Sequence, residues 1–306
     1  MDGQATGSKA RYGVWDIILS ERYFKWVLVM PLIIVLALFL IYPVVWVIHI
    51  SFFDYGGVKP PLFVGLDNYR EVLVNQEFWR ALGRTAQVLV TSIIIELVLG
   101  MGIAVLFNRN FKGQNFVRGF ILLPLLMTPL AVSMMWYYFL QYDFGAVNLM
   151  LEKLGFSKVM WFSPNVALHA VTAISIWQWI PFSIFVLLAG LKSLPRDAFE
   201  AAKVDGASAW YVFRRLTLPM LMPLIMIIVL LRTMWLIRLF DPLYATTRGA
   251  CNTEVLDWLI YRNVFVLFDI GRGATLAIIT LFFTFVVCAL LFRQLMKAMG
   301  VNLSSQ

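Results

Sequence analysis

Two charged residues interrupt apolar stretches that are otherwise long enough to cross a membrane. Glu96 stands within residues 85–107 and Arg232 within residues 216–236, and every other Lys, Arg, Asp or Glu falls outside such stretches. An ionised side chain inside a bilayer is costly and usually faces a partner or a functional cavity. The guanidinium group of Arg232 can bind sugar hydroxyl groups, or an anionic group in bidentate fashion. Two other roles stay open: an ion pair with Glu96, or a side chain that extends to the outer membrane interface.

Aromatic side chains near these charges favour a carbohydrate, because a ring can stack on the C–H face of a sugar. Trp235 follows Arg232 by three residues and therefore lies on the same helical face. Residues 177–179 read Trp-Gln-Trp, and the Pro181 that follows frees a backbone carbonyl group, which is tolerated where a helix lines a cavity. The alternative for these tryptophans is a place in the interfacial belt. The candidate solute contacts are Trp177, Gln178, Trp179, Arg232 and Trp235.

The sequence shows no catalytic machinery of its own. A phosphate-binding P-loop needs a Gly-Lys pair, and none of the 19 glycines is followed by lysine. His49 and His169 lie in different apolar stretches with no Cys or carboxylate at ligand spacing, so we expect no metal site. No local motif suggests a Ser-His-Asp or Cys-His arrangement. We therefore expect a chain that is not an enzyme and binds no cofactor.

Composition indicates that the elements which hold these residues lie in a membrane. Apolar residues make up 61% of the chain and charged residues 14%, whereas soluble proteins carry roughly a quarter charged residues. A helix needs about 20 apolar residues to cross the hydrocarbon core. The first qualifying stretch has 25 residues, too long for a cleavable signal sequence. We predict an all-α membrane protein with six transmembrane helices, at residues 26–50, 85–107, 119–140, 166–190, 216–236 and 274–292.

The distribution of Lys and Arg predicts the orientation of these spans. Alternate connections fall into two sets. One set holds 14 Lys/Arg and 6 Asp/Glu, in residues 1–25, 108–118, 191–215 and 293–306. The other holds 10 Lys/Arg and 10 Asp/Glu, in residues 51–84, 141–164 and 237–273. We therefore expect both termini in the cytoplasm, and we attribute the basic character of the chain to topology and contact with membrane lipid, with no nucleic acid as partner.

The connection between the fourth and fifth predicted spans reads as two short helices joined by a turn. Pro195 suits the start of a helix, and the alanines of residues 196–203 give that helix a slim surface. Gly206 can adopt the left-handed conformation that ends it, and Ser208 can cap the next helix. Pro219 then bends the start of the fifth span.

This connection resembles the coupling loop of bacterial ABC importer permeases, in the carbohydrate-uptake branch related to maltose and glycerol-3-phosphate permeases. The residues that carry the resemblance are Glu200-Ala201-Ala202, Asp205-Gly206-Ala207, Phe213 and Leu218-Pro219. The resemblance implies that residues 192–219 pack into a cleft on an ATPase subunit and transmit its closure. It assigns coupling to Glu200, Ala201, Ala202, Asp205 and Gly206. The alternative is an ordinary amphipathic cytoplasmic hairpin, which any transporter can have.

Two further stretches resemble the same branch. One is residues 63–69 with Phe78-Trp79, and the other runs from Phe240-Asp241 to Gly271. The chain departs from the family at residues 248–251, which read Arg-Gly-Ala-Cys where a Gly-Gly-Pro turn is usual. That turn lies on the predicted outer side, where a solute-binding protein would dock.

The resemblance implies a permease subunit of an ATP-driven importer in the bacterial inner membrane. Residues 26–295 would form the transmembrane domain, between a cytoplasmic segment 1–25 and a cytoplasmic tail 296–306. The implied partners are a second, related permease, two ATPase subunits that bind ATP and Mg²⁺, and an extracytoplasmic solute-binding protein. We expect a carbohydrate or polyol as solute. The alternatives are an anionic solute such as a sugar phosphate, an ion-gradient-driven secondary transporter, and a membrane-embedded enzyme.

Overall fold

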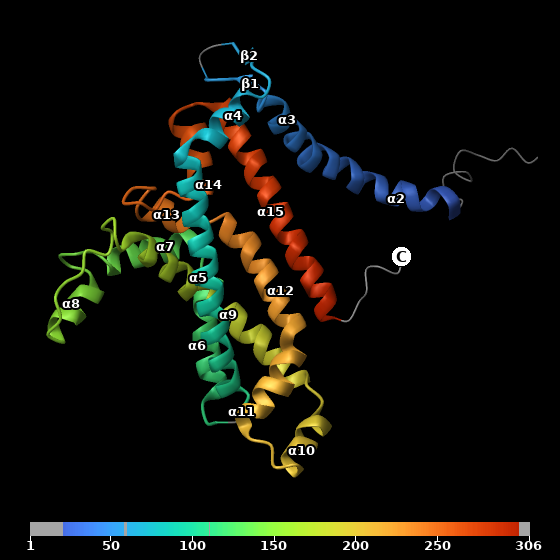
Figure 1. The fold of residues 1–306 in the computed structure, drawn as a ribbon, viewed down its shortest axis with the longest axis vertical. Helices are drawn as coiled ribbons and strands as arrows, with labels where there is room; N and C mark the ends of the chain where they lie inside the picture. The colour runs from blue at the N-terminus through green and yellow to red at the C-terminus, as the bar shows by residue number, and fades with distance from the viewer. Residues whose placement is uncertain (1–20, 58–59, 110, 300–306) are drawn as a thin grey trace, which may run out of the picture.

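The computed structural model describes residues 21–57, 60–109 and 111–299, and in this part of the chain the protein is a bundle of long helices (Figure 1). Five helical segments are long and apolar enough to cross a membrane, and a bent helix pair makes a sixth candidate. The predicted all-α class is confirmed. The bundle helices are α5 (Gln76–Phe107), α9 (Ala167–Ser193), α12 (Leu218–Ile237) and α15 (Ile270–Ala298), with the bent pair α6 (Gln114–Leu126) and α7 (Pro129–Phe139).

The centre of the bundle is the packing of α5 along α9, with α12 against both. One hydrophobic cluster fills the end of the bundle near the predicted cytoplasmic loop, built from residues such as Met101, Leu187 and Ile228. A second fills the opposite half around Val88 and Leu236. The two central helices approach closely at Gly100, where an added Cβ atom would lie 3.1 Å from the Cβ atom of Ser183. Small residues at such contacts let helix backbones meet inside a membrane.

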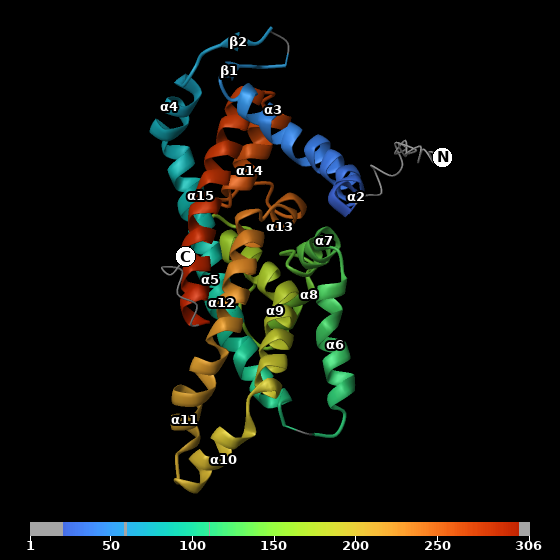
Figure 2. The same cartoon turned by 90° about the vertical axis from the view of Figure 1, so that its right-hand side faces the viewer.

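The third predicted span, at residues 119–140, is not one straight helix. It consists of α6 and α7, which meet at an angle of 100°. Pro129 disfavours helical conformation in the residue before it, and both Met127 and Thr128 are extended, with ψ angles of 148° and 139°. The apolar composition gave no sign of this break, because both arms are equally hydrophobic. Figure 2 shows α6 beside α9 and α7 turned across the bundle.

The first predicted span leaves the bundle sideways (Figures 1 and 2). It comprises α2 (Glu21–Leu36), a π-helical turn η1 (Ala37–Ile41) and α3 (Tyr42–Ile50). Only α3 packs on the bundle, against α15. Residues 28–50 are strongly apolar, yet none of the most hydrophobic window is buried within the described chain. This helix therefore requires lipid or another protein around it, because that much exposed apolar surface is unfavourable in water.

The short elements gather at the two ends of the bundle, in the alternation that the charge distribution predicts (Figure 1). One end carries the two-residue strands β1 (Phe53–Asp54) and β2 (Leu62–Phe63), with α4 (Asp67–Val74), α13 (Asp241–Ala245), α14 (Leu256–Tyr261) and the π-turn η3 (Arg262–Val266). An arm with α8 (Ala146–Lys153) extends from α7. The other end carries α10 (Arg196–Val204), α11 (Ala209–Val212) and the π-turn η2 (Phe213–Thr217).

The contact at Gly100 predicts which glycine of α5 the fold requires. Gly100→Leu places a side chain where Ser183 stands, whereas Gly102, two residues on, has no heavy atom within 4 Å of an added Cβ atom. Overpacking a helix contact costs about 1–3 kcal/mol. We expect Gly100→Leu to lower the thermal unfolding temperature of the purified permease clearly and Gly102→Leu to leave it close to the parent value. Equal melting temperatures for the two variants would contradict the packing of α5 on α9.

Candidate functional site

The loop at one end of the bundle has the two-helix form that its sequence predicts. The helix α10 spans Arg196–Val204, and Pro195 precedes it at the N-cap position without a side-chain hydrogen bond. Gly206 ends the turn with a φ angle of +71°, a conformation that costs glycine little. The Ser208 hydroxyl group accepts a hydrogen bond from the backbone N–H of Tyr211 at 3.3 Å and so caps α11. The π-turn η2 joins α11 to α12, and Pro219 lies in the first turn of α12.

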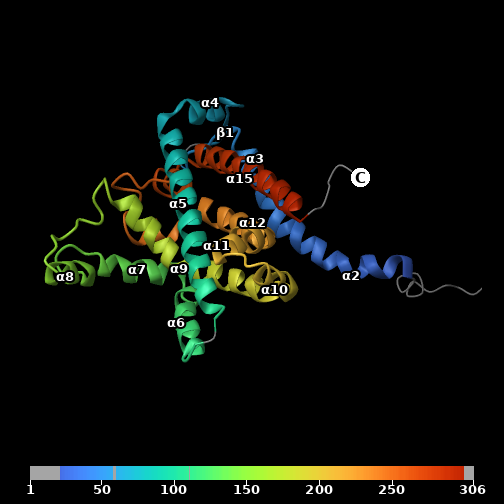
Figure 3. The same ribbon diagram turned by 60° about the horizontal axis from the view of Figure 1, so that its bottom comes forward.

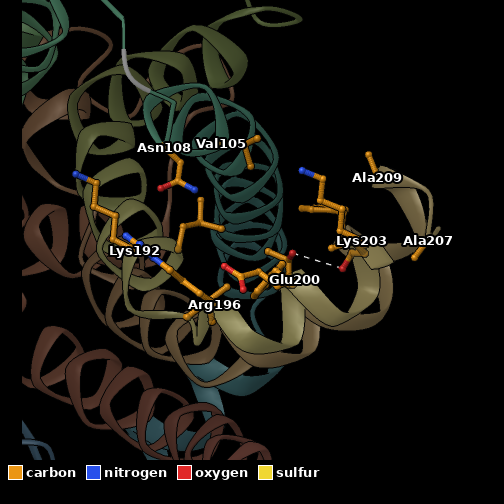
Figure 4. Close-up of a pocket in the computed structure, with 14 residues that line it drawn as sticks. Val105, Asn108, Lys192, Arg196, Glu200, Lys203, Ala207 and Ala209 are labelled. Carbon is orange, nitrogen blue, oxygen red and sulfur yellow. Dashed lines mark hydrogen bonds between the residues drawn. The ribbon is translucent and has the colours of Figure 1, made fainter. Parts of the chain in front are cut away.

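The predicted coupling residues lie on a loop that stands away from the bundle. Ala201, Asp205 and Gly206 are exposed, and Ala202 is half-buried. Glu200 is exposed too, but it lines a hollow of about 990 Å³ between α10 and the ends of α5 and α9. We call this space the loop hollow. Figure 4 shows Glu200 within it, between Arg196 and Lys203.

Inside the bundle, Arg232 of α12 and Glu96 of α5 form a buried ion pair. The Nε atom of Arg232 donates to the Oε2 atom of Glu96 at 2.6 Å, and Nη2 donates to Oε1 at 2.5 Å. The two side chains are 1% and 0% exposed. This planar two-bond geometry is the strongest contact that a guanidinium group makes with a carboxylate. Of the three roles that the sequence left open for Arg232, the structure shows the ion pair.

Aromatic rings cover the outward side of this pair. The guanidinium carbon of Arg232 lies 5.2 Å from the ring centre of Trp179, within cation–π range. The ring of Trp179 lies 4.5 Å from that of Trp235, and Phe182 packs edge-on against Trp235. The predicted proximity of Arg232, Trp179 and Trp235 is therefore present, and α9 and α12 both contribute to it.

These residues line a cavity of about 250 Å³, which we call the intramembrane cavity. Gln178 belongs to it and is 2% exposed. Its Nε2 atom donates to the carbonyl oxygen of Met127 at the α6–α7 break, whereas its Oε1 atom has no hydrogen-bond partner in the described chain. A buried amide oxygen without a partner is unfavourable and is available to a donor group of a ligand. Trp177 lies apart from this cavity, because its ring packs on Trp136 of α7.

Two cavity residues were not among those predicted from the sequence. Arg238 follows the end of α12 and Asp241 begins α13, and both line the outer part of the cavity. The sequence feature that could have predicted them is their position: both follow directly after the span that carries Arg232, where the chain turns back. With these two residues included, Arg232 and Arg238 balance Glu96 and Asp241 in formal charge.

The turn that departs from the family pattern is held by local hydrogen bonds. Arg248, Gly249, Cys251 and Asn252 have positive φ angles, and the hydroxyl groups of Thr247 and Thr253 lie 2.6 Å apart. An added Cβ atom at Gly249 would lie within the ring of Trp258. Only glycine fits this position, because it combines a positive φ angle with a close aromatic neighbour.

Charged residues fix this turn to the outer end of α5. Arg262 forms ion pairs of 2.7 Å with both Glu77 and Glu254, and Arg84 donates to the backbone oxygen of Glu254 at 3.3 Å. Burial is the main effect that raises the pKa of Glu254, and Arg262 opposes it. Burial likewise raises the pKa of Asp257, with Arg238 opposing. These contacts make the outer turn a fixed surface of the molecule.

A bundle of apolar helices with an internal ion pair, a polar cavity and a projecting two-helix loop defines a membrane permease. The chain belongs to the family described as the binding-protein-dependent transport system inner membrane component, whose pattern matches residues 96–298. The matched segment begins at Glu96 and includes the loop, Arg232 and the outer turn.

Curated relatives support this assignment along most of the chain. A probable ABC transporter permease protein of Sinorhizobium fredii is 37% identical over 278 residues, covering 89% of this chain and 90% of the relative. The trehalose/maltose transport system permease protein of Thermococcus litoralis is 33% identical, with coverage of 92% and 93%. The sulfoquinovosyl glycerol transport system permease protein of Agrobacterium fabrum is 32% identical, with coverage of 90% and 91%.

Solved structures share the fold. A crystal structure of a bacterial ABC transporter that imports the acidic polysaccharide alginate matches with a TM-score of 0.77 at 22% identity, covering 92% of this chain and 98% of the other. A second alginate transporter structure, in complex with an alginate pentasaccharide-bound periplasmic protein, matches with a TM-score of 0.79 at 21% identity, with coverage of 95% and 99%. The helical arrangement is thus that of an ABC importer permease.

The ion pair predicts a specific pattern of variant stability. Glu96→Met leaves the Arg232 charge buried alone, and Arg232→Met does the same to Glu96. Removing one member of a buried pair costs about 3–5 kcal/mol, whereas replacing both by apolar side chains is often neutral. We expect each single variant to reduce the yield of folded permease, and the double variant to restore it. Size-exclusion chromatography of detergent extracts measures this yield. A double variant as poor as either single variant would contradict the role of this pair in holding α5 to α12.

Proposed function

We propose that this chain forms half of the translocation pathway of an ATP-driven importer for a carbohydrate or polyol. The relatives support the solute class, since two of them are named as permeases for trehalose/maltose and for sulfoquinovosyl glycerol. The intramembrane cavity supports it as well. It combines the stacked rings of Trp179 and Trp235 with the free amide oxygen of Gln178, which suits a ligand that has C–H faces and hydroxyl donors.

The observation that favours an uncharged solute is the bidentate pairing of Arg232 with Glu96. A guanidinium group whose charge is neutralised by a paired carboxylate has little net attraction for a phosphate or carboxylate group of a solute. Arg238 and Asp241 balance one another in charge at the outer part of the cavity. An anionic solute is the second candidate, because the matched crystal structure is of an importer for an acidic polysaccharide; Arg238, which is exposed, is the residue that would meet it.

The proposed assembly has this chain beside a second, related permease, in a heterodimer. Two ATPase subunits lie at the loop end and hydrolyse ATP with Mg²⁺, and a solute-binding protein delivers solute at the opposite end. One structural relative carries a periplasmic protein with its oligosaccharide, which supports the last of these partners. Residues 26–295 form the transmembrane domain in this proposal. Residues 1–25 and 296–306 lie on the cytoplasmic side, where the Lys/Arg excess favours placing them.

The loop 192–219 is the proposed link to the ATPase. Its outer surface is exposed, and Val204 is 87% exposed at the end of α10. Trp210 and Tyr211 are exposed on the same loop, and exposed apolar side chains that gather on one surface mark an interaction site. The described chain offers no carboxylate or basic group that fixes Asp205 or Glu200 in an ion pair. Asp205 therefore remains available to contact the ATPase directly, whereas Glu200 lines the loop hollow.

The neutral cavity predicts how solute preference depends on charge. We expect proteoliposomes with the complete transporter and its binding protein to accumulate a labelled neutral disaccharide or polyol in preference to a sugar phosphate. Asp241→Asn leaves the cavity with one excess positive charge and should shift the preference toward the phosphate ester. Asp143→Asn, an exposed aspartate on the α8 arm, is the matched control and should change nothing. Preferential uptake of the phosphate ester by the parent transporter would overturn the neutral-solute proposal.

The turn at Gly206 predicts how coupling fails. Gly206→Val forces a β-branched residue into a positive φ angle, which alters the turn between α10 and α11. We expect the solute-stimulated ATPase activity of the complex to fall several-fold while the permease still inserts. Gly155→Val carries the same backbone strain, at φ +83° and with no atom near an added Cβ, but lies on the α8 arm. Normal coupling in Gly206→Val, or an equal loss in Gly155→Val, would count against the coupling assignment.

A further inference from the structure

Two hollows adjoin at the loop end of the bundle, and neither is needed for the solute pathway. The first is the loop hollow. The second is a groove of about 820 Å³ along α5 and α12, which we call the apolar groove. The two share Val105, Ala209 and Phe213 in their walls. A single molecule can therefore occupy both, with one part in each.

The loop hollow carries an excess of positive charge. Lys192, Arg196 and Lys203 line it together with one carboxylate, that of Glu200. Among the described residues, none of these three cations has a carboxylate oxygen within salt-bridge distance. Figure 4 shows the three spaced around the hollow, with Asn108 and Val105 of α5 on the far wall. The hollow thus presents unpaired cations and an amide to whatever enters it.

The apolar groove has the opposite character, because no charged side chain lines it. Its walls are Leu97, Val98, Met101, Gly102, Val105, Ala209, Trp210, Phe213, Leu218, Met222 and Ile225. It extends from the loop along the bundle helices, in the direction of the membrane interior. Gly102 widens it, since this position is exposed and has no heavy atom within 4 Å of an added Cβ atom.

We propose that the two hollows form one binding site for an anionic phospholipid, with its phosphate in the loop hollow and an acyl chain in the apolar groove. Charge complementarity and continuity support this occupant, because cations without a salt-bridge partner in the described chain lie directly beside a groove that suits hydrocarbon. Basic pockets between transmembrane helices on the cytoplasmic side bind acidic lipid headgroups. The proposal requires only that this end of the bundle meets the inner leaflet, and it is independent of the solute.

The position of the loop hollow distinguishes a lipid from the ATPase as its occupant. The hollow lies on the bundle side of α10, because Val105 and Asn108 at the end of α5 and Leu191 at the end of α9 form its other walls. The outer face of the loop stays free for a protein partner. Figure 3, which brings this end forward, shows α10 and α11 across the ends of the bundle helices. A bound lipid would fill the loop hollow and support α10 against the ends of α5 and α9.

The test uses the complete purified transporter, exchanged into mixed micelles that contain phosphatidylglycerol and phosphatidylcholine with identical acyl chains. Mass spectrometry then measures the lipid that stays bound. We expect the parent to retain phosphatidylglycerol preferentially. Lys192→Gln with Arg196→Gln should lower this preference about thirtyfold, since each basic residue at such a surface contributes about a factor of five. Arg214→Gln with Arg215→Gln is the matched control: both are exposed, lie at the same end and line neither hollow.

A second variant tests the groove separately. Gly102→Leu fills the groove without meeting another part of the chain and should reduce retention of both lipids. An unchanged elution volume and an unchanged thermal unfolding temperature confirm that the variants are folded. An unchanged lipid preference in the Lys192/Arg196 variant, or an equal loss in the Arg214/Arg215 control, would overturn the proposal. Loss in the Lys192/Arg196 variant with full retention in Gly102→Leu, together with displacement by inorganic phosphate, would instead assign a site for a free anion and overturn the lipid.

Discussion

The ion pair between Glu96 and Arg232 is the constraint on which the centre of this permease depends. It joins α5 to α12 at the level where two hydrophobic clusters meet: Met101 and Ile228 belong to the cluster on one side, and Val88 and Leu236 to the other. Both side chains are buried, so each charge requires the other. The pair therefore sets the register of the two helices more strictly than apolar packing does. A leucine side chain can pack against several alternative neighbours, whereas the bidentate contact requires both partners in one geometry. The same pair neutralises the charge of Arg232 on the wall of the intramembrane cavity. The contact that holds α5 to α12 therefore also affects which solutes the cavity suits.

The break between α6 and α7 is connected to this centre through a single side chain. The amide nitrogen of Gln178 donates to the carbonyl oxygen of Met127, which the extended backbone of the break leaves without a helical partner. A broken helix at membrane depth is tolerated where it is buried in protein or lines a cavity, and here Pro129, at the break, lines the intramembrane cavity. The amide oxygen of Gln178 remains free on the same residue. A solute that hydrogen-bonded to it would contact the residue that also holds the break, so the cavity and the bent helix pair share one polar group.

The two ends of the molecule differ in how they are fixed. The turn at residues 247–253 is held by Arg262 between Glu77 and Glu254 and by the hydroxyl contact of Thr247 with Thr253. The loop end is held mainly by its own caps and by the chain continuity through η2, with an open hollow behind it. The coupling role proposed for this loop requires it to move as one unit relative to the bundle, and the open hollow leaves room for such movement. The proposed phospholipid would support the loop from the membrane, through Lys192 and Arg196.

The sequence by itself determined the features that depend on local chemistry. Apolar length identified the membrane-crossing helices, and Gly206 and Ser208 identified the turn and cap of the loop, because a left-handed φ angle and an N-cap involve only neighbouring residues. The sequence also narrowed Arg232 to three roles, but the choice of Glu96 as its partner was made by the packing of α5 against α12, across 136 positions of the chain. Tertiary structure likewise separated Trp177 from Trp179 and brought Arg238 and Asp241 to the cavity. These outcomes depend on which helices pack against one another. That arrangement forms only in the folded chain, where apolar surfaces that are distant in the sequence come into contact.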